Sequence, residues 1–377
     1  MPSCLCVLRQ GVGRELGTIR ALPSVEGFHV SITIHGVNPD ETVTLLKERA
    51  RCFREGDQPL DGRKVGLIVE GGAMRGIISC AALLGLEELG MTQVFDEVYG
   101  ASAGALNAAY FLARQAALAT TIYYQKINNT RFIRRLWHRR IVDIDDLFDR
   151  IIARDWPLRV DKVLASRSQF FISIADAQTG EAFLGHAQTS TTPLLTLLKA
   201  SSAMPLLYNG LVTVDGRNCF DGGLFNPLPI LEAIEAGCTD LLVLLTRPAG
   251  FRECMPTIIE RQIFELGCAR RNTRLMNAFN SSYIRANDLR DIALGRRALP
   301  SGINIATICP EETDPKIERI TRNARLLKAA AAASVRRTLQ AFGHVVGELV
   351  EVLRPFPALE PDSPVVTSSS SKLRLRY

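Results

Sequence analysis

A chain of 377 residues that is 47% hydrophobic, with 45 Lys and Arg against 39 Asp and Glu, is expected to fold around a large core rather than to be disordered. Its nine cysteines form no Cys-x-x-Cys pair and its five histidines show no ligand spacing. These patterns argue against a disulfide framework and against a zinc or other histidine-rich metal centre, so we expect no cofactor.

The first 60 residues are predicted to form an N-terminal extension with a short strand and a helix. The strand is expected over Phe28–Ile34, where polar and apolar residues alternate. The helix is expected over residues 39–54, because Asn38 can accept bonds from its first amides and Pro39 fits the first helical position. A polar stretch then separates this extension from the rest of the chain.

From Lys64 the sequence has the pattern of an α/β protein, in which short apolar runs precede amphipathic helices. This alternation predicts a mostly parallel sheet that helices cover on both faces. The expected strands are Val65–Val69, Phe95–Tyr99, Phe170–Ala175, Ala182–Leu184, Val212–Val214, Cys219–Phe220, Leu241–Leu245 and Ile303–Ile308. The expected helices are Ile77–Leu89, Ala105–Gln115, Thr191–Ala200, Leu228–Ala236 and Arg325–Phe342.

The chain is therefore divided into three parts. Residues 61–350 are predicted to be one domain, preceded by the extension of residues 1–60. Residues 351–377 are rich in proline, serine and threonine, and we expect this tail to be disordered.

A Gly-x-Ser-x-Gly motif, Gly100–Gly104, lies between a predicted strand and a predicted helix. A serine on such an elbow adopts a strained backbone with an exposed hydroxyl, and the flanking glycines avoid collisions with the neighbouring strand and helix. The amides at the start of the helix would stabilise negative charge near Ser102. The alternative is a turn of small residues in which Ser102 only caps the helix, and the pentapeptide alone does not separate the two.

The segment Glu70–Gly76, EGGAMRG, also follows a predicted strand and opens a helix. Backbone amides in such a loop converge on anions. One interpretation is a phosphate cradle, but the Walker lysine and Ser/Thr are missing and the Gly-x-Gly-x-x-Gly spacing is not matched. The other is an oxyanion hole beside a nucleophile, which we favour because the serine elbow follows one strand later.

The third motif, Asp221-Gly222-Gly223, directly follows the strand that ends at Phe220. Two glycines after an acid allow a tight turn that brings the carboxylate close to another loop. An ordinary turn aspartate is the better interpretation in isolation. The order of the three motifs, each at the end of a predicted strand where α/β proteins have their sites, favours a functional role.

These three motifs, together with Ala200–Pro205 (ASSAMP), resemble those of the patatin-like phospholipases, most closely the bacterial members. The resemblance covers roughly residues 64–345. It implies a three-layer α/β/α fold and a Ser-Asp dyad that hydrolyses acyl esters of lipids, as a phospholipase A or a lysophospholipase does.

The resemblance also implies roles for individual residues. Ser102 would be the nucleophile and Asp221 the base that takes its proton, while the amides around Gly71, Gly72 and Ala73 would form the oxyanion hole. Arg75 matches the basic position of that loop, where we expect it to anchor the loop rather than to take part in the chemistry. The supporting positions of the motifs are Arg75, Gly76, Gly100, Gly104, Gly222 and Gly223.

A dyad agrees with the few histidines of the chain. The only histidine after Asp221 is His344, at the end of a predicted helix and a poor candidate for a triad. In a dyad the carboxylate contacts the serine directly, so burial that raises the pKa of Asp221 would make it a better base.

The loop departs from the family at Ala73, where a third glycine is usual. If this residue needs a positive φ, its Cβ costs roughly 1 kcal/mol or more and distorts the hole. Two alternatives therefore stay open beside a hydrolase: a catalytically weak or inactive lipid-binding or interaction protein on the same fold, and an acyltransferase that uses an alcohol in place of water.

Residues 131–140 are the most basic stretch of the chain. Such a segment can rest on an anionic bilayer, with its aromatic and aliphatic groups at the interface. A solvated amphipathic segment packed beside the site is the interpretation that we favour. Contact with a membrane would involve Arg131, Arg134, Arg135, Trp137, Arg139 and Arg140.

Other partners and the location follow from the composition. A net charge of +6 is too small for a dedicated nucleic-acid-binding protein, and an acyl-ester lipid is the expected substrate. No run of about 20 apolar residues predicts a spanning helix, and the N-terminus lacks a basic leader. We expect a cytoplasmic protein whose contact with membranes, if any, is peripheral.

Overall fold

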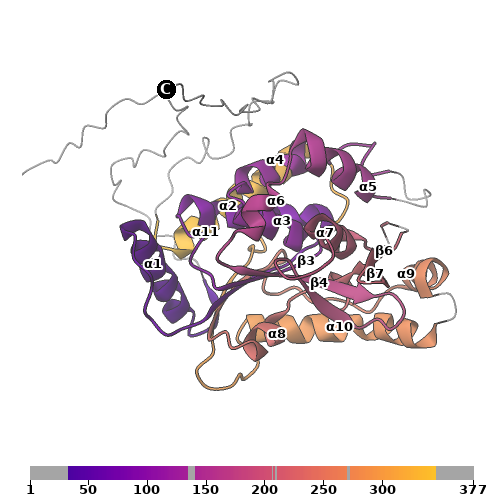
Figure 1. The fold of residues 1–377 in the computed structure, drawn as a ribbon. Coiled ribbons are helices and arrows are strands. Elements are labelled where there is room, and N and C mark those ends of the chain that lie inside the picture. The colour runs from indigo at the N-terminus through magenta and orange to yellow at the C-terminus, as the bar shows by residue number, and fades with distance from the viewer. Residues whose placement is uncertain (1–32, 135–140, 206, 209, 270–271, 345–377) are drawn as a thin grey trace, which may run out of the picture.

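The computed structural model describes residues 33–134, 141–205, 207–208, 210–269 and 272–344, which form a sheet between two layers of helices (Figure 1). The nine strands described are β1 (His35–Val37), β2 (Val65–Val69), β3 (Glu97–Ala101), β4 (Gln169–Asp176), β5 (Ala182–His186), β6 (Val212–Val214), β7 (Arg217–Asp221), β8 (Asp240–Leu244) and β9 (Asn304–Ile308). Their order is β1-β9-β8-β2-β3-β4-β7-β6, and β5 also pairs with β4. Neighbouring strands from β9 to β4 are parallel, and the outer pairings are antiparallel. This is the mostly parallel α/β/α sheet that the sequence predicts.

Helices cover both faces of the sheet (Figure 1). One face carries α2 (Ile77–Glu88), α3 (Ala103–Leu112), α4 (Ala116–Gln125), α7 (Leu194–Ser202) and α11 (Ala324–Ala341), and the other carries α8 (Ile230–Glu235) and α10 (Thr273–Ala293). The remaining α-helices are α1 (Pro39–Glu55), α5 (Ile144–Asp146), α6 (Val160–Leu164) and α9 (Ile258–Phe264). Shorter 3-10 segments are Ala73–Gly76 and Gly222–Leu224, and π-helical segments are Leu147–Asp155 and Glu265–Ala269.

Strand β2 shows why this arrangement follows from the sequence. All five of its residues are apolar or glycine and buried, as expected of a central parallel strand covered on both faces. Because side chains alternate along a strand, Leu67 and Val69 pack with the layer that contains α2 and α11, while Ile68 packs with α8 and α10.

The first described strand differs from the predicted one. Residues 28–32 lie outside the described part, and residues 33 and 34 precede β1, which begins at His35 and pairs antiparallel with β9. Helix α1 follows as predicted, but Asn38 does not cap it through its side chain. Instead, Asn38 Nδ2 donates a 2.9 Å hydrogen bond to Asn304 Oδ1 in β9, and the residue adopts a left-handed φ of 44°.

Helix α1 is tied to the sheet by a buried arginine. Arg49 is 3% exposed and forms ion pairs of 2.8 Å with Asp61 and 2.7 Å with Asp96, the residue that precedes β3. The division of the chain at residue 60 stays a prediction, and the predicted tail, residues 351–377, lies outside the described residues. No helix in the described part is long and apolar enough to cross a bilayer.

Candidate active site

Two strands that are distant in sequence meet on one edge of β4. Strand β3 pairs with the first half of β4 and ends with Ala101 opposite Ser173. Strand β7 continues along β4 from the next residue, with Asp221 opposite Ile174. Both strands lie on the same edge, because β5 occupies the other edge along residues 171–175. The residue after Ala101 is Ser102, so the register brings Ser102 and Asp221 together.

Ser102 is the only link between β3 and α3. Its φ of 57° and ψ of −135° are strained for a residue with a side chain, a conformation that costs of order 1–3 kcal/mol. The Gly100–Gly104 motif is therefore a one-residue elbow, with Gly100 and Ala101 in the strand and Ala103 and Gly104 in the helix.

The flanking glycines are required by close contacts. A Cβ on Gly100 would lie 2.4 Å from the Cα of Ala105 in α3, and a Cβ on Gly104 would lie 2.3 Å from the carbonyl oxygen of Val69 in β2. These are the collisions with strand and helix that the motif predicts.

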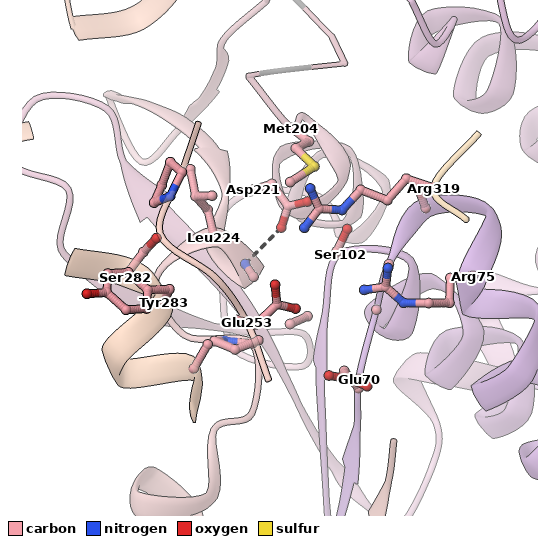
Figure 2. Close-up of a pocket in the computed structure, with 18 of the residues that line it drawn as sticks. Glu70, Arg75, Ser102, Met204, Asp221, Leu224, Glu253, Ser282, Tyr283 and Arg319 are labelled. Atoms are coloured by element: carbon pink, nitrogen blue, oxygen red, sulfur yellow. Dashed lines mark hydrogen bonds between the residues drawn. The ribbon is translucent and has the colours of Figure 1, made fainter. Parts of the chain in front are cut away.

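Asp221 is fully buried at the end of β7 (Figure 2). Burial raises its pKa to about 7, while the neighbouring Ser102 side chain, a hydrogen bond from the Gly223 amide and the charge of Arg319 oppose the rise. The bond from the Gly223 amide is 2.8 Å long. Gly222 allows β7 to lie against β4, since a Cβ there would lie 2.4 Å from the Ile174 nitrogen.

The loop of Gly71, Gly72 and Ala73 lies against the elbow. A Cβ on Gly71 would lie 2.4 Å from the Ala101 carbonyl oxygen and 2.7 Å from Ser102 Cβ, so only glycine allows this approach. Within the described part of the chain, the amides of Gly71, Gly72 and Ala73 have no hydrogen-bond acceptor. They line a cavity together with Ser102.

Ala73 has a φ of 52°, the conformation in which its Cβ is unfavourable. Residue 73 therefore does need a positive φ, as the sequence analysis considered, and this position favours glycine. Gly72 has a φ of 143°.

Arg75 holds this loop from one side. Its side chain is buried, and its Nε donates a 3.1 Å hydrogen bond to Thr246 Oγ1. A Cβ on Gly72 would lie 3.0 Å from the same Nε, so the guanidinium packs on the loop backbone. Burial lowers the pKa of Arg75 to about 10.

Two cavities meet at Ser102. One cavity has a mixed polar and apolar lining and is called the polar cavity below. It is partly open to solvent, extends toward α10 and is lined by Glu70, Asp221, Glu253, Tyr283 and others. An apolar cavity extends between α3, α4 and the 144–147 segment and is lined mainly by aliphatic and aromatic side chains. Ala73, Ser102, Met204 and Arg319 line both cavities.

Residues 67–234 match the family model described as patatin-like phospholipase. This region is a patatin-like phospholipase domain. The family supports hydrolysis of lipid acyl esters as the general activity.

Two further proteins are similar to the chain. Uncharacterized protein YjjU of Escherichia coli (strain K12) is 26% identical over 331 residues, which cover 83% of this chain and 89% of that protein. The solved structure of VipD from Legionella pneumophila aligns with 11% identity and a TM-score of 0.34, over 74% of this chain and 67% of that one.

Ser201 positions the elbow of the patatin-like domain. The sequence marks its segment as a motif but assigns it no role. Ser201, in the ASSAMP segment, accepts a 2.9 Å hydrogen bond from the Ser102 amide and donates a 2.7 Å bond to the Ser173 carbonyl. Its place in a motif was the available signal.

A buried network below the polar cavity was also missed. Glu70 accepts hydrogen bonds from the amide and hydroxyl of Thr246 and forms a 3.2 Å ion pair with Arg290 of α10. Arg319, which lies beyond the family match, carried no sequence signal at all.

The basic segment is only partly described, because residues 135–140 lie outside the described ranges. Arg131 forms a 3.4 Å ion pair with Asp146, and Arg134 pairs with Asp143. Both arginines thus have carboxylate partners on the patatin-like domain.

Proposed function

We propose that the protein is a serine-dependent hydrolase of lipid acyl esters, with Ser102 as nucleophile and Asp221 as base. One observation carries this proposal: an elbow serine and a buried aspartate line the same cavity, and the pKa of the aspartate, on which the serine side chain acts, is raised to about 7. A base whose pKa lies near the working pH is partly deprotonated, and it is also basic enough to accept the proton of the nucleophile.

In the proposed first step, Ser102 Oγ attacks the ester carbonyl carbon and its proton passes to Asp221. The C–O bond to the alcohol breaks, and the alkoxide takes the proton from Asp221. Water then attacks the acyl-enzyme, again giving a proton to Asp221, which returns it to Ser102 Oγ as the fatty acid leaves. The amides of Gly71, Gly72 and Ala73, which have no acceptor among the described residues, are the proposed donors to the oxyanion.

The two cavities suggest how a substrate would lie. The apolar cavity suits an acyl chain, because its lining includes Leu106, Ile122 and Phe132. The polar cavity suits the alcohol part of the ester. With Ser102 lining both, the carbonyl carbon would lie at their junction.

A non-catalytic lipid-binding protein is the main rival, and covalent labelling separates the two. A fluorophosphonate probe should label wild-type protein and not Ser102→Ala, while Ser281→Ala, whose exposed hydroxyl bonds to carbonyls within α10, should retain labelling. Hydrolysis of short p-nitrophenyl esters should follow the same pattern. Folded wild-type protein that shows neither labelling nor hydrolysis would exclude the enzyme.

Acyl transfer is the second rival, and the same dyad could perform it. Mass spectrometry of products formed with and without an added acceptor alcohol distinguishes the two. Free fatty acid as the main product in both cases supports hydrolysis, whereas a new ester that replaces it would assign transfer.

Contact with membranes and the location stay proposals. We infer a cytoplasmic protein from the odd number of cysteines, of which the described Cys52, Cys80, Cys219, Cys238, Cys254 and Cys309 are free. Cell fractionation tests this location. For the basic segment, sedimentation with anionic liposomes tests whether replacing Arg135, Arg139 and Arg140 lowers binding, and unchanged binding would exclude the contact.

A further inference from the structure

Most charged side chains around the polar cavity have a partner within the protein. Glu70 pairs with Arg290 at 3.2 Å, and Glu260 accepts bonds from the amide and hydroxyl of Thr257, the residue that caps α9. Arg75 is fixed to Thr246. Apart from Asp221, which belongs to the proposed dyad, the charged groups left to meet a ligand are those of Arg319 and Glu253.

Arg319 stands at the junction of the two cavities. Its guanidinium has no hydrogen-bond or ion-pair partner among the residues that the structure describes. Its backbone is tied to the proposed oxyanion loop, since its carbonyl accepts a 3.3 Å hydrogen bond from the Met74 amide. Figure 2 shows the guanidinium beside Asp221 and Ser102, and its charge contributes to the pKa of Asp221. An unpaired, partly buried arginine of this kind favours a planar oxyanion such as phosphate.

Glu253 supplies the opposite charge to the same cavity (Figure 2). Its backbone is fixed by two 2.9 Å hydrogen bonds with the side chain of Asn287 in α10. Its carboxylate has no hydrogen-bond or ion-pair partner within the described ranges. A free carboxylate repels a purely anionic ligand and attracts an ammonium group.

We propose that the polar cavity is a binding site for a zwitterionic phosphodiester headgroup, with Arg319 on the phosphate and Glu253 on the ammonium group. This inference rests on the proposed function and specifies its substrate class: acyl esters of glycerophospholipids that carry an amine in the headgroup. In such lipids the phosphate is a few bonds from the ester, which fits an arginine beside the nucleophile.

The test compares substrates that share one acyl chain: lysophosphatidylethanolamine, lysophosphatidylglycerol and monoacylglycerol. Wild-type kcat/KM should be highest for the ethanolamine lipid. Arg319→Gln should lower kcat/KM for both phospholipids relative to monoacylglycerol by at least about tenfold, with partial recovery in Arg319→Lys. Glu253→Gln should lower the ratio of kcat/KM for lysophosphatidylethanolamine to kcat/KM for lysophosphatidylglycerol by a similar factor. Arg322→Gln and Glu312→Gln, at exposed residues that do not line this cavity, are matched controls that should keep the wild-type ratios.

Binding to a Ser102→Ala background separates this inference from the proposed function. Calorimetry with short-chain lysophosphatidylethanolamine should show an affinity that falls about tenfold with either added substitution, even if the protein hydrolyses nothing. Hydrolysis with equal rates on the three lipids, unaffected by Arg319→Gln, would overturn the headgroup site and leave the hydrolase in place. Inorganic phosphate that binds as tightly as the lipid would assign Arg319 to free anions and likewise overturn it.

Discussion

Ser201 holds the backbone of Ser102: its hydroxyl accepts a 2.9 Å hydrogen bond from the Ser102 amide and donates a 2.7 Å hydrogen bond to the Ser173 carbonyl. A buried side chain thus connects the elbow to β4, the strand along which β3 and β7 meet. The strained elbow keeps its geometry because its amide has a buried partner.

Ser201→Ala should therefore impair both stability and turnover. It leaves the partly buried Ser102 amide without its partner, at a cost of up to about 1–3 kcal/mol, and it releases the elbow. Thermal denaturation and p-nitrophenyl ester hydrolysis measure the two effects. Ser202→Ala, the adjacent control, should be milder in both assays. Equal behaviour of the two variants would show that Ser201 does not support the elbow.

Replacing the nucleophile should reveal the strain at the elbow. Ser102→Gly relieves a φ of 57° that Ser102→Ala retains. Relief of this strain stabilises the fold by of order 1–3 kcal/mol, whereas the flexibility of glycine favours the unfolded chain by only about 0.5–1 kcal/mol. Ser102→Gly should therefore unfold at a higher denaturant concentration than Ser102→Ala. A less stable glycine variant would contradict a strained elbow.

Ala73→Gly should stabilise the loop and preserve or raise esterase turnover. Ala73 has a φ of 52°, where a Cβ costs roughly 1 kcal/mol or more. Initial rates with p-nitrophenyl esters and a melting curve test the two expectations. A large loss of turnover would mean that the Cβ of Ala73 supports activity and does not strain the loop.

Activity should rise with pH as Asp221 loses its proton. The pKa of Asp221 is raised to about 7 by burial, so kcat/KM should climb with an apparent pKa near that value and level off above it. A neutral ester is the substrate of choice, because its own charge does not change. A rate that stays constant between pH 5 and 8 would exclude Asp221 as the base.

The same shift predicts an opposite trend in stability. A carboxyl whose pKa is raised on folding stabilises the fold while it is protonated, and that contribution is lost as the pH rises from its unfolded value through about 7. Asp221→Asn should match wild type near pH 4 and exceed it at pH 8, by up to about 4 kcal/mol in free energy of unfolding. Equal stabilities at pH 8 would indicate that the carboxylate is solvated.

Local sequence predicted the elements near the site because their patterns are unambiguous. Strand β2 is an apolar run between Lys64 and Glu70, and its ends were predicted to the residue. Strand β3 begins two residues later than expected, at Glu97, because Phe95 is apolar and buried but precedes the ladder. The long helix α10 was assigned no range, since its apolar positions are few and its surface is largely polar.

What the sequence could not predict depends on contacts between distant segments. The pairing of Asp221 with Ile174, directly beyond the end of β3, follows from sheet register and not from any motif. Asn38 bonds to Asn304 rather than capping α1, because β9 lies beside it. Arg319 lies in a loop with no local pattern, and only the fold brings it to Ser102.

The rate at which a fluorophosphonate labels Ser102 in wild type and in Asp221→Asn tests the dyad most directly. Intact-protein mass spectrometry follows the adduct over time, and peptide mapping assigns it to Ser102. We expect wild-type labelling that accelerates through pH 7 and folded Asp221→Asn that reacts about 10²–10⁴-fold more slowly. Equal labelling of the two proteins, or an adduct on another residue, would contradict activation of Ser102 by Asp221.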